Sequence, residues 1–255
     1  MTDKTHASLV TDQFGPQAAA YVASTVHAEG EDLEALTKVV AGRSTGCVLD
    51  LGCGGGHVSF RVAPDVAQVT AYDLSESMLA AVAKAAAERG LTNLATRQGA
   101  VERLPFADGS FDFVFSRYST HHWHDFQAAL REARRVLKSG GRAVFMDQIS
   151  PGPALLDTFL QAVELLRDPS HLRDYSLAEW LQAVTGAGFA PGMIVQRRLR
   201  LDFASWIARM RTPDIRAQAI RSLQAEMSSE VTKHFAIEAD GSFTIDTVSL
   251  EATPI

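Results

Sequence analysis

Short apolar runs alternate with amphipathic stretches through the middle of the chain, from residue 47 to residue 158. The apolar runs have the length of β-strands and cover residues 47–51, 68–72, 94–98, 111–116 and 142–147. Strand-like runs that alternate with helical patterns are typical of parallel sheets with crossover helices. We therefore predict an α/β fold for this part of the chain.

Two of the intervening stretches carry clear helix signals. Residues 75–90 begin with Ser75, a good N-cap, and end on Gly90, a good C-cap. Residues 126–140 show the same periodicity and carry basic side chains near their C-terminal end, where the helix dipole favours them. Both stretches are predicted to be helices.

The two ends of the chain are predicted to cover this core. Residues 11–40 have the pattern of two helices broken at Gly30, and residues 1–42 are expected to form an N-terminal helical lid over a core of residues 43–150. In the C-terminal half, residues 151–255, we expect helices at 154–166, 177–185, 203–211 and 214–227, a strand at 193–201, and a hairpin at 231–253 turning at Ala239-Asp240-Gly241. The helices within residues of about 202–228 would form a second lid on a single domain.

Composition and charge narrow the class of protein. The chain has 255 residues, of which 46% are hydrophobic and 21% charged, as in ordinary folded domains. The net charge of −6 disfavours binding to nucleic acid or to anionic lipid. Cys47 and Cys53 are too few for a disulfide scaffold or a metal ribbon, and no segment is apolar enough for a signal peptide or a membrane span. These features predict a cytoplasmic protein with no nucleic-acid or membrane partner.

A glycine-rich turn follows the first predicted strand, in the run VLDLGCGGGH at residues 48–57. Glycines allow a sharp turn and the close approach of a ligand to the backbone, and the next helix offers free N–H groups. The dinucleotide pattern G-x-G-x-x-G fails because His57 occupies the place of its third glycine. Asp50 would also repel a pyrophosphate, but it would complement a cationic ligand that carries an ammonium and a sulfonium group.

A second acidic residue, Asp73, follows the next predicted strand in AYDLSESML. At that place in an α/β sheet a carboxylate binds the two hydroxyls of a ribose. With these two motifs, and with LPFADGSFDFVFSR and LREARRVLKSGG, the chain resembles the class I S-adenosylmethionine-dependent methyltransferases, in particular the small-molecule group similar to the ubiquinone/menaquinone C-methyltransferases. The resemblance implies a Rossmann-like, doubly wound, mostly parallel seven-stranded sheet with an antiparallel C-terminal strand and helical lid insertions.

The resemblance also implies which residues bind the cofactor, S-adenosyl-L-methionine. The methionine part would contact Asp50, Gly52, Gly54 and Gly56, the ribose would contact Asp73, and the adenine would lie between Leu74 and Met78. Phe14 and Tyr21 would close over the cofactor, and Ala100, Val101 and Ser116 would complete its site. Gly99-Ala100-Val101 lacks the Asp that many relatives have for the adenine amino group, and the spacing of Met78 suits core packing equally well.

The methyl acceptor is expected at the loop after the fourth predicted strand, because ligands of α/β sheets bind beyond the carboxyl ends of the strands. In this loop Arg117, Tyr118 and Trp123 would contact the acceptor, and His121 and His122 are candidate catalytic bases because histidine titrates near neutral pH. A purely structural role for the histidines stays open. A metal site is disfavoured because no Asp/Glu ligand pair accompanies them.

The C-terminal lid offers a second candidate contact with the acceptor. Trp206 could pack on a planar substrate, and Arg209 or Arg211 could bind a carboxylate or phosphate. Alternatively, Trp206 and Met210 form a buried stripe and the arginines face water.

Together these features predict an enzyme, a monomer or homodimer, that methylates a small planar or acidic metabolite by in-line displacement. A non-catalytic protein that binds the cofactor and, more remotely, a nicotinamide-dependent oxidoreductase are the alternatives. The accepting atom, whether oxygen, nitrogen or carbon, stays open.

Overall fold

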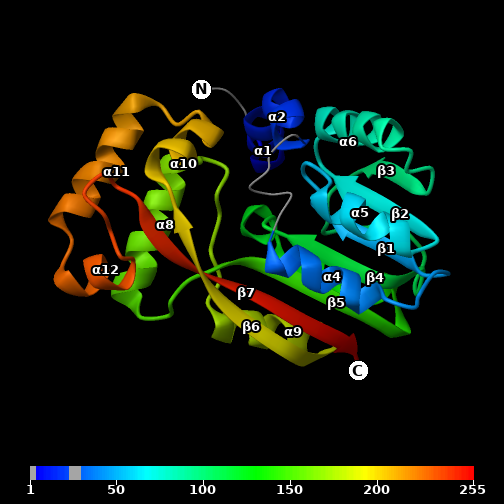
Figure 1. Cartoon of the computed structure of the whole chain (residues 1–255). Helices are drawn as coiled ribbons and strands as arrows, with labels where there is room; N and C mark the ends of the chain where they lie inside the picture. The colour runs from blue at the N-terminus through cyan, green and yellow to red at the C-terminus, as the bar shows by residue number, and fades with distance from the viewer. Residues whose placement is uncertain (1–3, 23–29) are drawn as a thin grey trace.

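A computed structural model describes residues 4–22 and 30–255 and shows one seven-stranded sheet (Figure 1). The strand order is β3-β2-β1-β4-β5-β7-β6. The strands are β1 (Cys47–Leu51), β2 (Gln68–Asp73), β3 (Leu94–Gln98), β4 (Phe111–Arg117), β5 (Leu137–Ile149), β6 (Phe189–Leu201) and β7 (Phe243–Pro254). Strands β1 to β5 pair in parallel, and β7 runs antiparallel to both of its neighbours. The predicted mostly parallel sheet with an antiparallel C-terminal strand is therefore confirmed.

Helices lie on both faces of the sheet and beyond one of its ends. They are α1 (His6–Phe14), α2 (Ala18–Val22), α4 (Glu31–Val40), α5 (His57–Val62), α6 (Glu76–Glu88), α7 (Phe126–Val136), α8 (Ala154–Arg167), α9 (Leu177–Gly186), α10 (Phe203–Met210), α11 (Asp214–Glu226) and α12 (Ser229–His234). Within the described residues, no helix is both long and apolar enough to cross a lipid bilayer.

The central strands β1 and β4 are mostly apolar because both of their faces are covered. In β1, Val48 packs with α4 and α5 on one face, whereas Leu49 and Leu51 pack with α7 and α9 on the other. This alternation is what a period of two residues imposes on a strand buried on both sides. It explains why the sequence pattern identified these strands as continuous apolar runs.

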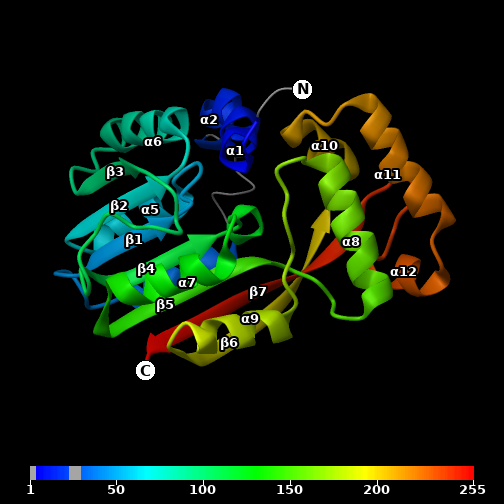
Figure 2. The ribbon, with the colours of Figure 1, turned by 180° about the vertical axis from the view of Figure 1, so that it is seen from behind.

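A second apolar core joins the C-terminal helices to the ends of β6 and β7. It contains Phe159 of α8, Trp206 of α10, Ile220 of α11 and Phe235 just after α12. From both sides of the molecule, α8, α10, α11 and α12 form a group beyond one end of the sheet, and α1 and α2 lie between this group and α6 (Figures 1 and 2).

The predicted hairpin at residues 231–253 is wrong. Its first half is α12 and the turn that follows, and its second half is β7, which inserts between β5 and β6 instead of pairing with its own upstream residues. Val231 and Phe235 are four residues apart and both reach the second apolar core, so packing selected a helix there. Periodicity in so short a segment does not distinguish the two structures.

Two predicted helices have different ends from those expected. The helix at 126–140 ends at Val136, because Leu137 already pairs with Phe111 of β4. The N-terminal helices begin at His6, earlier than expected, and are interrupted by a short 3₁₀ turn at Gly15–Gln17. Gly30 does precede a helix, α4, as predicted. Residues 23–29, which the first predicted helix also covered, lie outside the described part of the chain.

Candidate functional site

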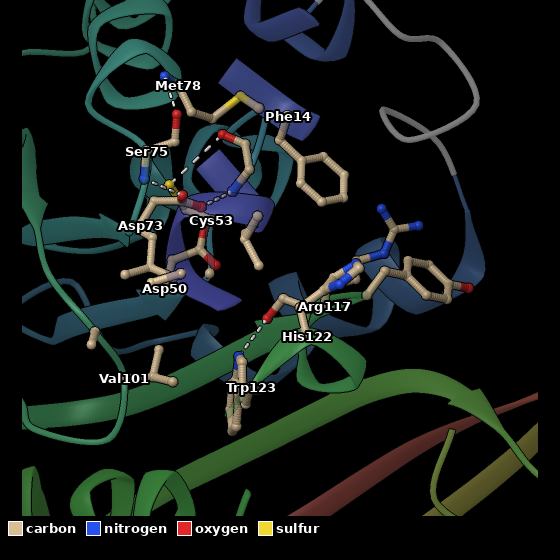
Figure 3. Close-up of a pocket in the computed structure, with 18 of the residues that line it drawn as sticks. Phe14, Asp50, Cys53, Asp73, Ser75, Met78, Val101, Arg117, His122 and Trp123 are labelled. Carbon is tan, nitrogen blue, oxygen red and sulfur yellow. Dashed lines mark hydrogen bonds between the residues drawn. The ribbon is translucent and has the colours of Figure 1, made fainter. Parts of the chain in front are cut away.

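A cavity of about 420 Å³ lies beyond the carboxyl ends of β1, β2, β3 and β4, under α1 and α2. Figure 3 shows Asp50, Asp73 and Met78 on one side of it and Arg117, His122 and Trp123 on the other. The chain order of the strands reverses between β1 and β4, and such a reversal is where doubly wound sheets bind ligands. The volume is in the range of small-molecule sites.

The structure places most of the predicted site residues at this cavity, but not all of them. Those that line it are Phe14, Tyr21, Asp50, Gly52, Gly54, Asp73, Leu74, Met78, Ala100, Val101, Arg117, Tyr118, His122 and Trp123. Those outside its lining are Gly56, Ser116, His121, Trp206, Arg209 and Arg211.

Asp50 is a buried carboxyl at the end of β1, held by the N-terminal turn of α5. Its Oδ2 accepts hydrogen bonds from the backbone N–H of Ser59 at 3.1 Å and from the Ser59 hydroxyl at 2.7 Å. Burial raises the pKa of Asp50 to about 7, and the Ser59 hydrogen bonds only partly oppose this. The ionised form of Asp50 is therefore disfavoured in the ligand-free chain, and a cationic ligand would stabilise it.

The glycine turn leaves room for a ligand next to Gly54. Gly54 has a positive φ of 47°, and a Cβ there would meet nothing within 4 Å, so the open side faces the cavity. Gly52, with φ of 63°, is constrained differently, because a Cβ there would collide with the Ser119 side chain. Gly56 packs against Phe60 and Val82, so it shapes the turn without lining the cavity.

Asp73 connects the glycine turn to the start of α6. Its two carboxylate oxygens accept hydrogen bonds from the backbone N–H groups of Gly54 and Ser75, each at 2.9 Å. Burial raises the pKa of Asp73, and these two hydrogen bonds oppose that rise. Each carboxylate oxygen can accept a further hydrogen bond. Beside it, Met78 is 1% exposed, and its side chain belongs to the cavity wall.

The opposite side of the cavity is largely aromatic. Phe14 contacts Tyr21 edge to face, with ring centroids 5.7 Å apart, and His122 at 5.0 Å. Tyr118 also lines the cavity and has a positive φ of 50°, a strained conformation for a large side chain. The Trp123 indole donates to the Ser119 hydroxyl at 3.2 Å. Aromatic rings from α1, α2 and the loop after β4 therefore surround this space.

Arg117 is the only Lys or Arg among the described residues that line the cavity. Its guanidinium forms a two-pronged ion pair with Asp32 of α4, with Nε–Oδ2 at 2.5 Å and Nη2–Oδ1 at 3.2 Å. It also lies over the Tyr118 ring, 5.0 Å from the centroid. The pair thus links α4 to the end of β4 at the edge of the cavity.

The two candidate bases differ in position and in charge. His122 lines the cavity, and burial together with the neighbouring His121 lowers its pKa. His121 lies behind it; burial disfavours its charged form, but the Asp147 carboxylate at 2.7 Å outweighs burial and raises its pKa to about 9. The expectation that both histidines titrate near neutrality is therefore wrong.

The expected acceptor contacts from α10 are not at the cavity. Trp206 is 1% exposed and packs on Phe243, with ring centroids 4.9 Å apart, in the second apolar core. Met210 is likewise buried, so the alternative of a buried stripe describes α10. Arg211 ends the helix and donates to the Gln13 carbonyl at 3.5 Å, and burial lowers the pKa of Arg209. Ser116 is also a core residue, bonded to the Ser119 hydroxyl.

Sequence reasoning missed several residues that line the cavity. They include Thr5, His6, Ala7 and Val10 of the N-terminal segment, and Cys53, Gly55, His57, Ser75, Glu102, Ser119 and His124 near the strand ends. The Thr5 N-cap, which accepts from the Ser8 N–H, was the available signal for a helix that starts this early. Within the described residues, no three His, Cys, Asp or Glu side chains group as metal ligands would.

Comparison with known proteins identifies the family. The family model described as "Methyltransferase domain" matches residues 49–145. The uncharacterised Escherichia coli K12 protein YafE is 50% identical over 197 residues, which are 77% of this chain and 95% of YafE. The uncharacterised methyltransferase YcgJ of Bacillus subtilis is 37% identical over 224 residues, 88% of each chain.

Structure and a further relative agree with this assignment. The crystal structure of YcgJ superposes with a TM-score of 0.84 and covers 88% of this chain and 97% of that one, at 33% identity. A demethylmenaquinone methyltransferase of Lactococcus lactis is 36% identical over 121 residues, 46% of this chain and 47% of that protein. The open glycine turn lies between the buried carboxyl of Asp50 and the partly buried carboxyl of Asp73, an acidic setting that suits the cationic S-adenosylmethionine. The chain belongs to the class I S-adenosylmethionine-dependent methyltransferases.

Proposed function

We propose that this methyltransferase acts on a small planar acceptor that binds between the aromatic side chains of α1, α2 and the loop after β4. The observation that carries the proposal is the composition of the cavity. Acidic and glycine positions form one half, and Phe14, Tyr21, Tyr118 and Trp123 surround the other. Flat rings pack well against such side chains.

The acidic half suits S-adenosylmethionine. Asp50 would face its ammonium group, Asp73 its ribose hydroxyls, and Leu74, Met78, Ala100 and Val101 its adenine. The cofactor supplies a methyl group on a sulfonium, which is electrophilic without further activation. The task left to the chain is to exclude water and to align the acceptor.

An acidic acceptor is the weaker alternative. Arg209 and Arg211, the side chains expected to bind a carboxylate or phosphate, lie outside the cavity lining, and Arg117 is already paired with Asp32. The Lactococcus lactis relative is named for its action on demethylmenaquinone, a molecule with a planar ring, which supports a planar acceptor here. The acidic net charge of −6 supports a small molecule over a nucleic acid.

We assign contact with the acceptor to His122, because it lines the cavity and His121 does not. Its Nδ1 lies 3.1 Å from the Ser170 carbonyl oxygen, to which it donates, so the unprotonated Nε2 is left to accept a proton. Because its pKa is lowered, the ring is neutral at physiological pH and in the form that a base requires.

The formation of S-adenosylhomocysteine tests the proposal. The full chain would be incubated with S-adenosylmethionine and matched sets of planar hydroxyaromatic and acyclic carboxylic acceptors. We expect the planar set alone to raise S-adenosylhomocysteine above the acceptor-free rate. Turnover confined to the acyclic acids would overturn the planar acceptor. Tight cofactor binding without turnover on any acceptor would favour the non-catalytic alternative.

Asp50 provides a pH-dependent prediction. The affinity for S-adenosylmethionine should rise as the pH rises through about 7, because the ammonium group favours the ionised carboxylate, whose pKa burial raises to about 7. The rise should approach about tenfold per pH unit on the acid side, the limit for one linked proton. Asp50→Asn should lose this part of the dependence, as measured by calorimetry from about pH 5.5 to about pH 8.

Folding stability without ligand should change in the opposite direction. The pKa of Asp50 in the folded chain lies above its ordinary value of 3.8. Protonation of Asp50 therefore stabilises the folded state, and this contribution to the free energy of unfolding is complete below pH 3.8. This contribution to folding stability is lost as the pH rises through about 7.

The affinity measurement can contradict the assignment of Asp50. If Asp50→Asn kept the same pH slope of cofactor affinity as the unmodified chain, Asp50 would not be the partner of the ammonium group.

A further inference from the structure

A buried carboxylate, Asp147 of β5, lies outside the cavity lining and is the partner of His121. It is 1% exposed. Its Oδ1 accepts from His121 Nδ1 at 2.7 Å and from the Gln148 backbone N–H at 2.9 Å. Its Oδ2 accepts from the Thr120 backbone N–H at 2.8 Å and from the Thr120 hydroxyl. This set of donors surrounds a full negative charge, and the pKa of Asp147 is accordingly lowered despite its burial.

The same carboxylate fixes both histidines through a short 3₁₀ turn, Thr120–His122. Thr120 anchors the start of the turn to Asp147, and the His121 ring bonds to the same carboxylate. The His121 and His122 rings are then only 4.2 Å apart between centroids. A positive charge on His121 therefore acts directly on His122.

Other titratable groups face this pair from the elements packed on it. From α8 and the segment after it come Glu164, Asp168, His171 and Asp174, and from α1 comes His6, which shares the Ser170 carbonyl with His122. Asp168 Oδ2 is 3.8 Å from His122 Nε2, so it favours a charged His122 and opposes the effect of His121. Burial raises the pKa of Asp174 well above its ordinary value.

We propose that Asp147 is a positioning residue for methyl transfer: it holds His121 as a charged neighbour that keeps His122 neutral, with Nδ1 donating to Ser170 and Nε2 unprotonated. The proposal rests on the role given above to His122. It assigns opposite tasks to two adjacent histidines, because His121 supplies charge and His122 contacts the acceptor. It also accounts for a buried ion pair that is not in contact with the cavity.

Histidine titration by ¹⁵N NMR in the complex with S-adenosylhomocysteine tests the proposal without any acceptor. In the unmodified chain we expect His122 to stay neutral from about pH 5.5 upward. In Asp147→Asn, His121 loses its counter-charge and becomes neutral near pH 7, so His122 should titrate closer to the ordinary histidine pKa of about 6.5. His121→Asn, which keeps an amide donor for Asp147, should have the same effect and serves if Asp147→Asn does not fold.

Asp246→Asn is the matched control. Asp246 of β7 also pairs with a histidine, His234 Nε2 of α12 at 2.9 Å, and neither residue lines the cavity. This variant should leave the titration of His122 unchanged. Once an acceptor is known, turnover of Asp147→Asn should fall about tenfold per pH unit below the new pKa and recover above it. An unchanged His122 titration in both variants would overturn the proposal, whereas a shifted titration in a chain inactive on planar acceptors would overturn only the proposed substrate.

Discussion

Asp73→Ala should weaken the binding of S-adenosylmethionine by about 30- to 150-fold, or about 2 to 3 kcal/mol. In the proposed cofactor site this carboxylate accepts both ribose hydroxyls, and charge-assisted hydrogen bonds are the stronger kind. Its removal also frees the N–H groups of Gly54 and Ser75, which it now holds at 2.9 Å, so the glycine turn loses its tie to α6. Isothermal titration calorimetry with S-adenosylhomocysteine measures the loss.

Two variants isolate this effect. Asp73→Asn keeps one acceptor oxygen and should lose less affinity than Asp73→Ala. Asp65→Ala removes the same charge from an exposed turn just before β2, at the other end of that strand from Asp73, and should leave affinity unchanged. Binding by Asp73→Ala as tight as in the unmodified chain would remove Asp73 from the ribose site.

His122→Ala should lower turnover by about 100-fold on an acceptor whose methylated atom carries a proton, with cofactor affinity intact. General-base assistance ranges from about 100- to 10,000-fold, and the lowered pKa of His122 makes it a weak base, which favours the lower end of that range. Single-turnover rates with saturating cofactor separate this effect from binding.

Small-molecule rescue provides the contrast. Imidazole should restore part of the turnover of His122→Ala, because the shortened side chain leaves space beside the cavity. The control is His234→Asn, a change at a histidine on α12 outside the cavity lining, which should leave turnover unchanged. Near-normal turnover by His122→Ala would mean that transfer proceeds by alignment alone, as suits an acceptor that is already deprotonated or is a carbanion.

The central sheet and the residues of the proposed cofactor half could be predicted from the amino-acid sequence. Strands buried on both faces must be apolar along their length, so β1 and β4 were recognisable without any knowledge of their neighbours. The glycine turn and Asp73 follow such strands directly, and a parallel sheet places the carboxyl ends of its strands at one edge. Local sequence therefore fixed both which residues these are and where they lie.

The proposed acceptor half could not be predicted from the sequence, because it depends on contacts between distant segments. His121 and His122 are adjacent in the chain, and Asp147, 26 residues away, determines which of them is charged. Trp206 has the appearance of a substrate contact in sequence, but its surroundings are set by β7 from the far end of the chain. The sheet position of β7 itself depends on β5 and β6. Each of these outcomes rests on contacts between distant segments, whose effects on burial and charge no local pattern of residues contains.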